Sequence, residues 1–322
     1  MILTPKELHK RKNEFTIVDV RSEKQITEFP MDGLKTISYN GESIPNMIGS
    51  KVLVCQFGIV TEGMIIENEL DDTFSLLGGA QAWIEFQTKK EDLSRWSRQT
   101  ILPEVGIDGQ KKLLNATVAI VGMGGLGCPA AQSLITAGVG KLILIDGDIV
   151  ELSNLHRQPL YGVEDVNRLK VEVAKERLEQ LNNKAVIIPI DKYFNEKNGM
   201  SFIQNANVII DATDNIQARQ LIDRFSKEAN VPMVYGGLFR YEGQVAVLNV
   251  NGSSGYCELF PEPPSSGGDT CADAGVLGML PGIIGNIQTL EAVKLIVGIE
   301  PNLVGKLLIY DGKSHKTEII QL

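Results

Sequence analysis

VAIVGMGGLGCPA, residues 118–130, places an apolar run directly before a loop that contains four glycines. The apolar run predicts a buried β-strand, and the residues after the glycines predict the start of a helix. In a turn between a strand and a helix, glycines let backbone N–H groups and the positive helix end approach phosphate oxygens. Asp146 follows Gly127 by nineteen residues, where a carboxylate can bind ribose hydroxyls. This stretch therefore predicts a nucleotide site.

Strand and helix patterns alternate after this stretch. The predicted strands are residues 116–123, 140–148, 185–191, 206–215 and 231–238, and the predicted helices are residues 128–139, 168–182 and 216–230. Residues 241–250 and 306–322 predict antiparallel strands, and Asp311 and Gly312 form a turn signal between two apolar runs. We therefore expect an α/β fold with a mainly parallel sheet, helices on both faces and antiparallel additions at an edge.

The composition excludes several classes of partner. The 322 residues contain 31 Lys and Arg against 40 Asp and Glu, and the net charge of −9 repels nucleic acid and anionic lipid. The first fifteen residues lack the apolar core of a signal peptide, and we find no apolar stretch of the about 18 residues that a membrane span needs. We expect a cytoplasmic protein with no nucleic-acid partner and no membrane partner.

A change in composition between residues 84 and 97 divides the chain. This stretch, IEFQTKKEDLSRWS, is polar and charged and lacks a buried-strand pattern, which is typical of a linker or an exposed connecting helix. Near the start of the chain, Thr4 and Glu7 form the capping box of a predicted helix. We expect a small α/β domain over residues 1–88 and a larger domain over residues 89–322.

The glycines alone do not choose the nucleotide. Gly122, Gly124 and Gly127 also fit the G-x-G-x-x-G pattern of dehydrogenases, so a nicotinamide-dependent oxidoreductase is one alternative, and a mere packing turn is another. Arg157 and Lys170 follow the acidic residue in the sequence. Two cations beside a phosphate loop suit a triphosphate whose charges are neutralised as pyrophosphate leaves. Taken singly, each cation is as consistent with an ordinary surface residue.

Five motifs in a fixed order carry a resemblance to a known family. They are RWSRQTILPEVG at 95–106, GMGGLG at 122–127, ILIDGDIVELSNLHRQ at 143–158, DATDN at 211–215 and CADAGVLGMLPGIIGNIQTLEAVKLIVG at 271–298. From Arg95 onward the chain resembles the ubiquitin-like-protein activating enzymes, in particular the MoeB, ThiF and HesA group. The resemblance implies a Rossmann-like domain that uses ATP to adenylate the C-terminal glycine of a small sulfur carrier ending in Gly-Gly, before thiocarboxylate formation. The molybdopterin-synthase carrier is the first expectation; a carrier of the thiamine or another pathway and a non-catalytic scaffold are alternatives.

The same resemblance assigns site residues. Those implied for nucleotide binding are Gly122, Gly124, Gly125, Gly127, Asp146, Asp148, Asn154, Arg157, Gln158 and Lys170. Asp214 would hold Mg²⁺, and an Asp before a helix can also be its N-cap, which is compatible with the metal role. Arg98 would enter the partner subunit's site as an arginine finger, which implies a homodimer. The chemistry is consistent, because a C-terminal carboxylate is ionised at pH 7 and needs alignment and charge neutralisation, here from Arg157, Lys170 and Mg²⁺, rather than a strong base.

The four cysteines are Cys55, Cys128, Cys257 and Cys271, and no two of them form a C-x-x-C pair. Relatives bind zinc with two such pairs, so we expect no zinc in this protein. Cys271 lies where relatives carry a cysteine that forms a covalent adduct with the carrier, and a catalytic and a dispensable role are both open. We expect Cys128 to pack at a helix start and Cys257 to be an ordinary thiol.

A second resemblance covers about residues 4–85. TIVDVRSE at 16–23 and LLGGAQAW at 76–83 are similar to the opening and closing motifs of rhodanese domains. Cys55, in VLVCQFG, lies where that family has its persulfide cysteine, which implies a sulfurtransferase activity. The loop CQFGIV lacks the arginine that commonly supports the persulfide. A structural or docking domain is therefore the alternative.

Overall fold

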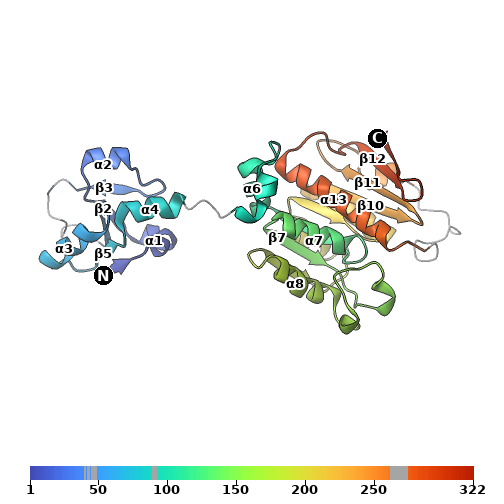
Figure 1. The fold of residues 1–322 in the computed structure, drawn as a ribbon, viewed down its shortest axis with the longest axis horizontal. Helices are drawn as coiled ribbons and strands as arrows, with labels where there is room; N and C mark the ends of the chain where they lie inside the picture. The colour runs from blue at the N-terminus through green and yellow to red at the C-terminus, as the bar shows by residue number, and fades with distance from the viewer. Residues whose placement is uncertain (40, 42–43, 45–48, 89–92, 262–274) are drawn as a thin grey trace. The chain divides into compact units, whose positions relative to one another are not determined.

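The computed structural model of this chain describes residues 1–39, 41, 44, 49–88, 93–261 and 275–322 and contains two compact units (Figure 1). The first unit is Met1–Asp92 and the second is Leu93–Leu322. The division lies four residues after residue 88, where the composition placed it. Each unit has apolar clusters of its own, so each is described by itself.

The first unit is a five-stranded parallel sheet with the strand order β1-β5-β4-β2-β3. Its strands are β1 (Ile2–Leu3), β2 (Thr16–Asp19), β3 (Thr36–Ser38), β4 (Lys51–Val54) and β5 (Thr73–Leu76). Its helices are α1 (Pro5–Arg11), α2 (Glu23–Glu28), α3 (Ile59–Glu67) and α4 (Gly79–Thr88), with a 3₁₀ turn η1 (Lys12–Glu14). Local sequence signals, such as the capping boxes that begin α1 and α2, favour the helices of this parallel α/β unit.

Helix α1 begins as the sequence predicts. The Thr4 hydroxyl accepts from the Glu7 backbone N–H, and the Glu7 carboxylate accepts from the Thr4 backbone N–H at 2.9 Å. Leu8 of α1 and Trp83 of α4 are fully buried in one cluster on the sheet. The capping box thus starts a helix whose apolar side holds α4 to the same face.

The second unit is an eight-stranded sheet with the order β13-β12-β11-β10-β9-β6-β7-β8. Its strands are β6 (Thr117–Val121), β7 (Lys141–Ile145), β8 (Val186–Ile190), β9 (Val208–Asp211), β10 (Met233–Phe239), β11 (Glu242–Leu248), β12 (Lys306–Asp311) and β13 (Lys316–Gln321). From β10 to β8 the neighbours run parallel, and from β10 to β13 they run antiparallel. The predicted mainly parallel sheet with antiparallel additions is therefore confirmed.

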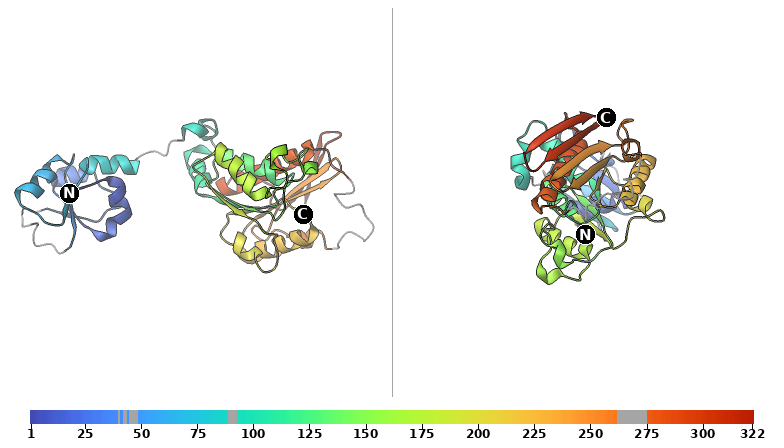
Figure 2. Two further views of the ribbon diagram at one scale, coloured as in Figure 1. Left: turned by 90° about the horizontal axis from the view of Figure 1, so that it is seen from below. Right: turned by 90° about the vertical axis from the view of Figure 1, so that its right-hand side faces the viewer.

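Helices cover both faces of this sheet (Figure 2). One face carries α7 (Gly127–Ala137), α8 (Lys170–Leu181) and α13 (Met279–Val297), and the other carries α9 (Gly199–Ile203), α10 (Ile216–Ala229) and α11 (Tyr256–Leu259). Shorter segments are η3 (Ser94–Trp96), α5 (Ser97–Thr100), α6 (Gly106–Asn115), η4 (Leu152–Asn154) and η5 (Val163–Asp165). Cys128 is fully buried in the first turn of α7, as expected.

Helix α13 corrects one expectation from the sequence. It has 19 residues with a mean hydropathy of 1.2, so by length and composition it meets the requirement of a membrane span. Half of it is buried inside the unit, where Gln288 and Glu291 of the same helix are also buried. One such helix is weak support for a membrane span, because the core helix of a globular unit has the same composition.

Candidate functional site

The candidate site lies where the strand order reverses direction. β6 pairs with β7 on one side and β9 on the other, and Val121 is in register with both Ile145 and Asp211. The three strands are parallel, so their carboxyl ends meet at one edge of the sheet. In open α/β sheets, ligands bind outside the carboxyl ends at such a switch point.

The glycine loop after β6 is held against the residues that follow β9. Gly122 has a φ of +95°, and a Cβ there would lie 2.6 Å from the Ala212 carbonyl oxygen. A Cβ on Gly127 would overlap the Gly122 carbonyl. A Cβ on Gly124 would lie 3.6 Å from Gln158 Nε2, and one on Gly125 would lie 3.6 Å from Arg157 Cδ. Gly122 and Gly127 therefore pack against backbone atoms, whereas Gly124 and Gly125 face the predicted site residues Gln158 and Arg157.

Asp146 connects the end of β7 to this loop. Its Oδ2 accepts from the Met123 backbone N–H at 2.7 Å, and its Oδ1 accepts from the Asp148 backbone N–H at 2.8 Å. Burial raises the pKa of Asp146, while the charge of Lys170 lowers it. The carboxylate is thus a structural tie as well as a candidate ribose ligand, and the ribose contact remains a prediction.

Lys170 is the first residue of α8 and is 6% exposed. Its Nζ lies 3.0 Å from Asp148 Oδ2, and the Tyr193 hydroxyl donates to Asp148 Oδ1 at 2.7 Å. Burial alone would raise the pKa of Asp148, but these hydrogen bonds and the Lys170 charge outweigh it, so the pKa is lowered. Sequence analysis missed Tyr193, because it follows β8 and no motif includes it.

The remaining predicted nucleotide residues lie in and after η4. Asn154 is buried and its Oδ1 accepts from the Glu151 backbone N–H at 3.2 Å. Arg157 donates from Nη1 to the Ser153 carbonyl at 3.0 Å. Gln158 is 2% exposed, and its Oε1 has no hydrogen-bond partner among the described residues. An unsatisfied buried acceptor beside the glycine loop is one that a ligand donor would satisfy.

Asp214 lies in the loop between β9 and α10 and is exposed. The alternative that Asp214 caps α10 is wrong, because Asn215 is the N-cap and its side chain accepts from the Ala218 backbone N–H at 3.1 Å. The loop is fixed to the neighbouring strand, where the Ala212 N–H donates to the Val121 carbonyl at 2.9 Å. Asp214 therefore follows two residues that pack on Gly122 of the glycine loop, and it has no capping role.

The donor set fits a nucleoside triphosphate with Mg²⁺ better than a free metal. Within the described part of the chain, no group of three or more His, Cys, Asp or Glu is placed to hold a metal ion. Mg²⁺ commonly takes one or two carboxylates and completes its shell with substrate phosphates and water. The residues around the glycine loop are consistent with that requirement. They provide the exposed carboxylate of Asp214, the buried ammonium of Lys170 and the unsatisfied amide oxygen of Gln158.

The matched family decides the identity of the second unit. The model of the ThiF family matches residues 96–322. The chain belongs to the ThiF family. It is 43% identical over 233 residues to the Xenopus laevis adenylyltransferase and sulfurtransferase MOCS3, covering 72% of this chain and 51% of that protein. It is 41% identical over 228 residues to a Thermus thermophilus sulfur carrier protein adenylyltransferase, covering 69% and 84%. This chain thus spans about half the length of the MOCS3 relative it matches.

Solved structures agree on the fold. A crystal structure of PaaA superposes with a TM-score of 0.62 at 30% identity, covering 72% of this chain and 73% of that one. A structure of E. coli MccB with MccA-N7isoASN superposes with a TM-score of 0.64 over 75% of this chain and 78% of that one. At 21% identity, the second match shows the fold alone.

Arg98 does not join the other site residues of the ThiF-family unit. It is exposed on α5. Residues on either side of Arg98 are hydrogen-bonded to the last turn of α7. Trp96 Nε1 donates to the Thr136 carbonyl at 2.8 Å, and Gln99 Nε2 donates to the Ala137 carbonyl at 3.0 Å. The glycine loop leads into the first turn of the same helix. Eleven residues of helix span about 16 Å, so Arg98 lies at the opposite end of α7 from the site.

The structure describes two of the other three cysteines, Cys55 and Cys257. Cys271 lies outside the described residues. Cys257 is exposed as a residue, but partial burial of its thiol and a hydrogen bond to Asp223 raise the pKa of the thiol to about 11. Cys55 belongs to the N-terminal unit, which precedes the ThiF match.

Cys55 lies at the start of a loop rich in backbone donors. The residue is 6% exposed, and its Sγ accepts from the Gly58 N–H at 3.1 Å and lies 3.6 Å from Thr61 Oγ1. Burial alone would raise the pKa of this thiol, but hydrogen bonds from loop N–H groups and the Thr61 hydroxyl outweigh it and lower the pKa.

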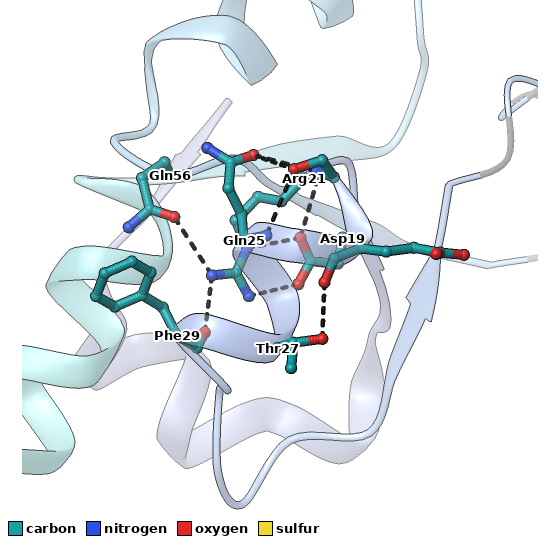
Figure 3. A network of polar contacts seen from close by, with 8 residues as sticks. Asp19, Arg21, Gln25, Thr27, Phe29 and Gln56 are labelled. Atoms are coloured by element: carbon teal, nitrogen blue, oxygen red, sulfur yellow. Dashed lines mark hydrogen bonds and ion pairs between the residues drawn. The ribbon is translucent and has the colours of Figure 1, made fainter.

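A buried ion pair between Asp19 and Arg21 contacts Gln56, the residue after Cys55 (Figure 3). Arg21 donates to both oxygens of Asp19, from Nη2 to Oδ2 at 2.7 Å and from Nε to Oδ1 at 2.9 Å. Its Nη1 donates to the Phe29 carbonyl at 2.9 Å and to Gln56 Oε1 at 3.4 Å. The loop CQFGIV contains no arginine. Arg21 contacts the side chain of Gln56, the residue after Cys55.

Proposed function

We propose that this chain uses ATP to adenylate the C-terminal glycine of a small ubiquitin-like sulfur carrier, which prepares the carrier for thiocarboxylate formation. The observation that carries the proposal is the buried Lys170, whose Nζ is held 3.0 Å from Asp148 Oδ2 at the carboxyl end of the sheet. The names of the MOCS3 and Thermus thermophilus relatives support a sulfur carrier as substrate. The molybdopterin-synthase carrier is the first candidate, and a thiamine-pathway or other carrier is the alternative.

The chemistry requires alignment and charge neutralisation. The carrier's terminal carboxylate attacks the α-phosphorus of ATP, forming the acyl-adenylate as pyrophosphate leaves. Backbone N–H groups of the glycine loop and the start of α7 bind phosphate oxygens, and Lys170 and Arg157 neutralise the charge on the departing pyrophosphate. Gln158 and Asn154 would orient the nucleotide. No proton has to leave the nucleophile, because the carboxylate is already ionised at neutral pH.

Mg²⁺ belongs to the same proposal, with Asp214 as its protein ligand. Mg²⁺ held by Asp214 would offset the negative charge of the nucleotide phosphates. The position of Asp214 supports this role, because its loop packs on Gly122 and the cap of α10 is provided by Asn215.

A homodimer in which Arg98 acts in the partner's site is also proposed. Its support is the position of Arg98 at the far end of α7, from which it does not serve its own subunit's glycine loop. Helix α13 supports it further: an exposed apolar stripe runs along it, with Met279 at 69%, Ile283 at 38% and Leu290 at 53% exposure.

The directions of these helices suggest how two copies would meet. α13 packs beside α7, begins near the glycine loop, where Pro281 contacts Gly125, and ends at α6, where Lys112 donates to the Val297 carbonyl. A two-fold axis across this face pairs each helix with its copy in the opposite direction. That arrangement brings the partner's α5 end, with its Arg98, toward the glycine-loop end of this subunit.

A sulfurtransferase role for Cys55 is a second proposal, favoured by the lowered pKa of its thiol and the N–H groups around its sulfur. The Cys55 thiolate attacks the outer sulfur of a donor persulfide or of thiosulfate, and a new S–S bond forms as the donor thiolate or sulfite leaves. The test is intact-mass analysis after incubation with thiosulfate or with a cysteine desulfurase and cysteine. A 32 Da adduct, about one sulfur atom, that is absent from Cys55→Ala supports the role; an adduct found only on Cys271, or none with either donor, contradicts it.

Location and excluded partners remain proposals. The net charge of −9 supports the absence of a nucleic-acid or anionic-membrane partner, and a cytoplasmic location is proposed with it. A vesicle-flotation assay with anionic vesicles checks this, and recovery of the protein with the vesicles would contradict it.

The proposed activity is tested by incubating the protein with ATP and each of several purified carriers ending in Gly-Gly. Release of pyrophosphate with one carrier supports adenylation and names the pathway. Carrier binding without pyrophosphate release would instead indicate a scaffold. Tight binding of a nicotinamide cofactor with no ATP binding would indicate an oxidoreductase.

A further inference from the structure

A buried ion pair lies beneath the loop that carries Asp214. Asp211 ends β9 and is fully buried, and the side chain of Arg219, in α10, is 11% exposed. Asp211 Oδ2 and Arg219 Nε lie 3.3 Å apart, and neither atom has a hydrogen-bond partner among the described residues. The Arg219 guanidinium also lies 5.1 Å from the centre of the Tyr235 ring. None of the sequence motifs assigned a role to Arg219.

Asp211 and Arg219 both form hydrogen bonds to Thr213, the residue before Asp214. Arg219 Nη2 donates to the Thr213 carbonyl at 2.6 Å and to the Gly236 carbonyl of β10 at 3.0 Å. Asp211 Oδ1 accepts from the Thr213 backbone N–H at 3.0 Å and from the Thr213 hydroxyl at 2.6 Å. The Thr213 carbonyl is half of the peptide bond to Asp214. The backbone N–H, the carbonyl and the hydroxyl of Thr213 are therefore all held by the ion pair.

The other sides of the loop are fixed as well. The Ala212 N–H is bonded to Val121, and Gly122 packs on the Ala212 carbonyl. Asn215 is held as the N-cap of α10. Gln288 of α13 donates from Nε2 to the Asp211 carbonyl at 2.7 Å. Contacts from β6, α10, β10 and α13 thus hold the backbone on both sides of Asp214, while the Asp214 residue itself is exposed.

Stability alone is a weak explanation for this arrangement. Removing two charges from water costs free energy that their attraction often fails to recover, so buried ion pairs contribute little to stability compared with apolar packing. Their hydrogen bonds instead specify one geometry. Direct contact between Arg219 and phosphate is also a poor explanation, because its Nη2 is committed to two carbonyls and its side chain is buried.

We propose that Asp211, Arg219 and Thr213 form a positioning network that sets the Asp214 carboxylate for the Mg²⁺ of bound nucleotide. The proposal rests on the proposed function, which assigns Asp214 to the metal. Partners that orient a metal ligand are worth about 10- to 100-fold in metal affinity.

The test uses Mn²⁺ as the probe and a non-hydrolysable ATP analogue, with the full chain. Mn²⁺ affinity is measured by electron paramagnetic resonance for wild type, Thr213→Val, Thr213→Ser, Arg219→Lys and Asp214→Asn. Arg224→Lys is the matched control, because Arg224 lies on the same helix and its ion pair with Glu228, 3.7 Å apart, is on the surface. Analogue affinity without metal and the melting temperature are measured on each variant.

We expect Thr213→Val and Arg219→Lys to weaken Mn²⁺ binding at least about tenfold. Analogue affinity without metal should stay within about twofold of wild type, which a mere folding defect would not allow. Thr213→Ser, which keeps the hydroxyl, should restore wild-type affinity, and Arg224→Lys should match wild type.

Two contrary outcomes are distinguishable. If Asp214→Asn weakens Mn²⁺ binding but Thr213→Val and Arg219→Lys do not, the positioning network is refuted and the metal assignment stands. If Asp214→Asn leaves Mn²⁺ affinity unchanged, the metal assignment is wrong and the network has no ligand to position.

Discussion

Lys170 Nζ lies 3.0 Å from Asp148 Oδ2, while the Tyr193 hydroxyl holds the other oxygen of the same carboxylate at 2.7 Å. One carboxylate therefore orients a buried ammonium and is itself fixed by a tyrosine. A cation oriented before its ligand arrives needs little reorganisation as charge develops in the transition state.

Lys170→Ala should lower the rate of carrier-dependent ATP–pyrophosphate exchange by about 10²- to 10³-fold, the typical cost of removing one preorganised electrostatic group. Tyr193→Phe should lower it by less than about tenfold, because Asp148 keeps its ion pair and loses one hydrogen bond. Lys175→Ala is the control, since Lys175 lies on α8 with only a surface partner, Glu179, at 4.0 Å. An exchange rate for Lys170→Ala equal to that of Lys175→Ala would remove Lys170 from the site.

Arg98 provides a test of the dimer. Arg98→Ala and Lys170→Ala subunits are each expected to be inactive alone. Co-expressed, they should form mixed dimers in which one of the two sites combines an intact Lys170 with an intact Arg98 from the partner. Random pairing then restores about a quarter of the wild-type rate. No restoration in verified mixed dimers, or a fully active monomer in sedimentation, would contradict action across the interface.

Much of the second unit could be predicted because its signals are local. The strand and helix periods and the glycines at 122–127 each depend on residues close in the sequence, as does the capping box at Thr4 in the first unit. The order of the strands needed pairings between distant segments, such as β6 with β9, which no local pattern contains.

Sequence analysis missed two site residues for the same reason, because their contacts join segments that are distant in the sequence. Tyr193 meets Asp148 across 45 residues, and Arg219 meets the Gly236 carbonyl from a different element. The hydroxyl and guanidinium types are common throughout the chain, so only the fold selects these two. Asp214 and Asn215 were ambiguous for another reason: adjacent Asp and Asn side chains both suit an N-cap, and the backbone decided for Asn215.

The thiol of Cys55 should titrate below an ordinary cysteine, because loop N–H groups and the Thr61 hydroxyl stabilise its thiolate. A lowered pKa keeps the thiolate present as the pH falls, so the midpoint of its alkylation rate should lie below the pH of about 8.5 of a free thiol. Thr61→Val should raise that midpoint, and exposed Cys257, with its pKa near 11, should react only at higher pH. Peptide mass analysis after timed iodoacetamide labelling measures all three. A Cys55 midpoint at or above 8.5, or one that Thr61→Val leaves unmoved, would refute the stabilisation.

Stoichiometric zinc should be missing from the purified protein. The sequence lacks a C-x-x-C pair, and the raised pKa of Cys257 disfavours the thiolate that zinc requires. Elemental analysis of protein prepared in metal-free buffer provides the measurement. A ratio near one zinc per chain would show that other ligands replace the missing cysteines.

ATP–pyrophosphate exchange with a matching carrier tests the central claim most directly. Labelled pyrophosphate should enter ATP only when ATP, Mg²⁺ and a carrier ending in Gly-Gly are all present, because the exchange requires reversible attack of the terminal carboxylate on the α-phosphorus. Removing the two glycines from the carrier should abolish exchange, and Asp214→Ala should reduce it at least about 10²-fold, the size expected for losing a transition-state charge partner. Exchange that proceeds without a carrier, or at the wild-type rate in Asp214→Ala, would contradict the account.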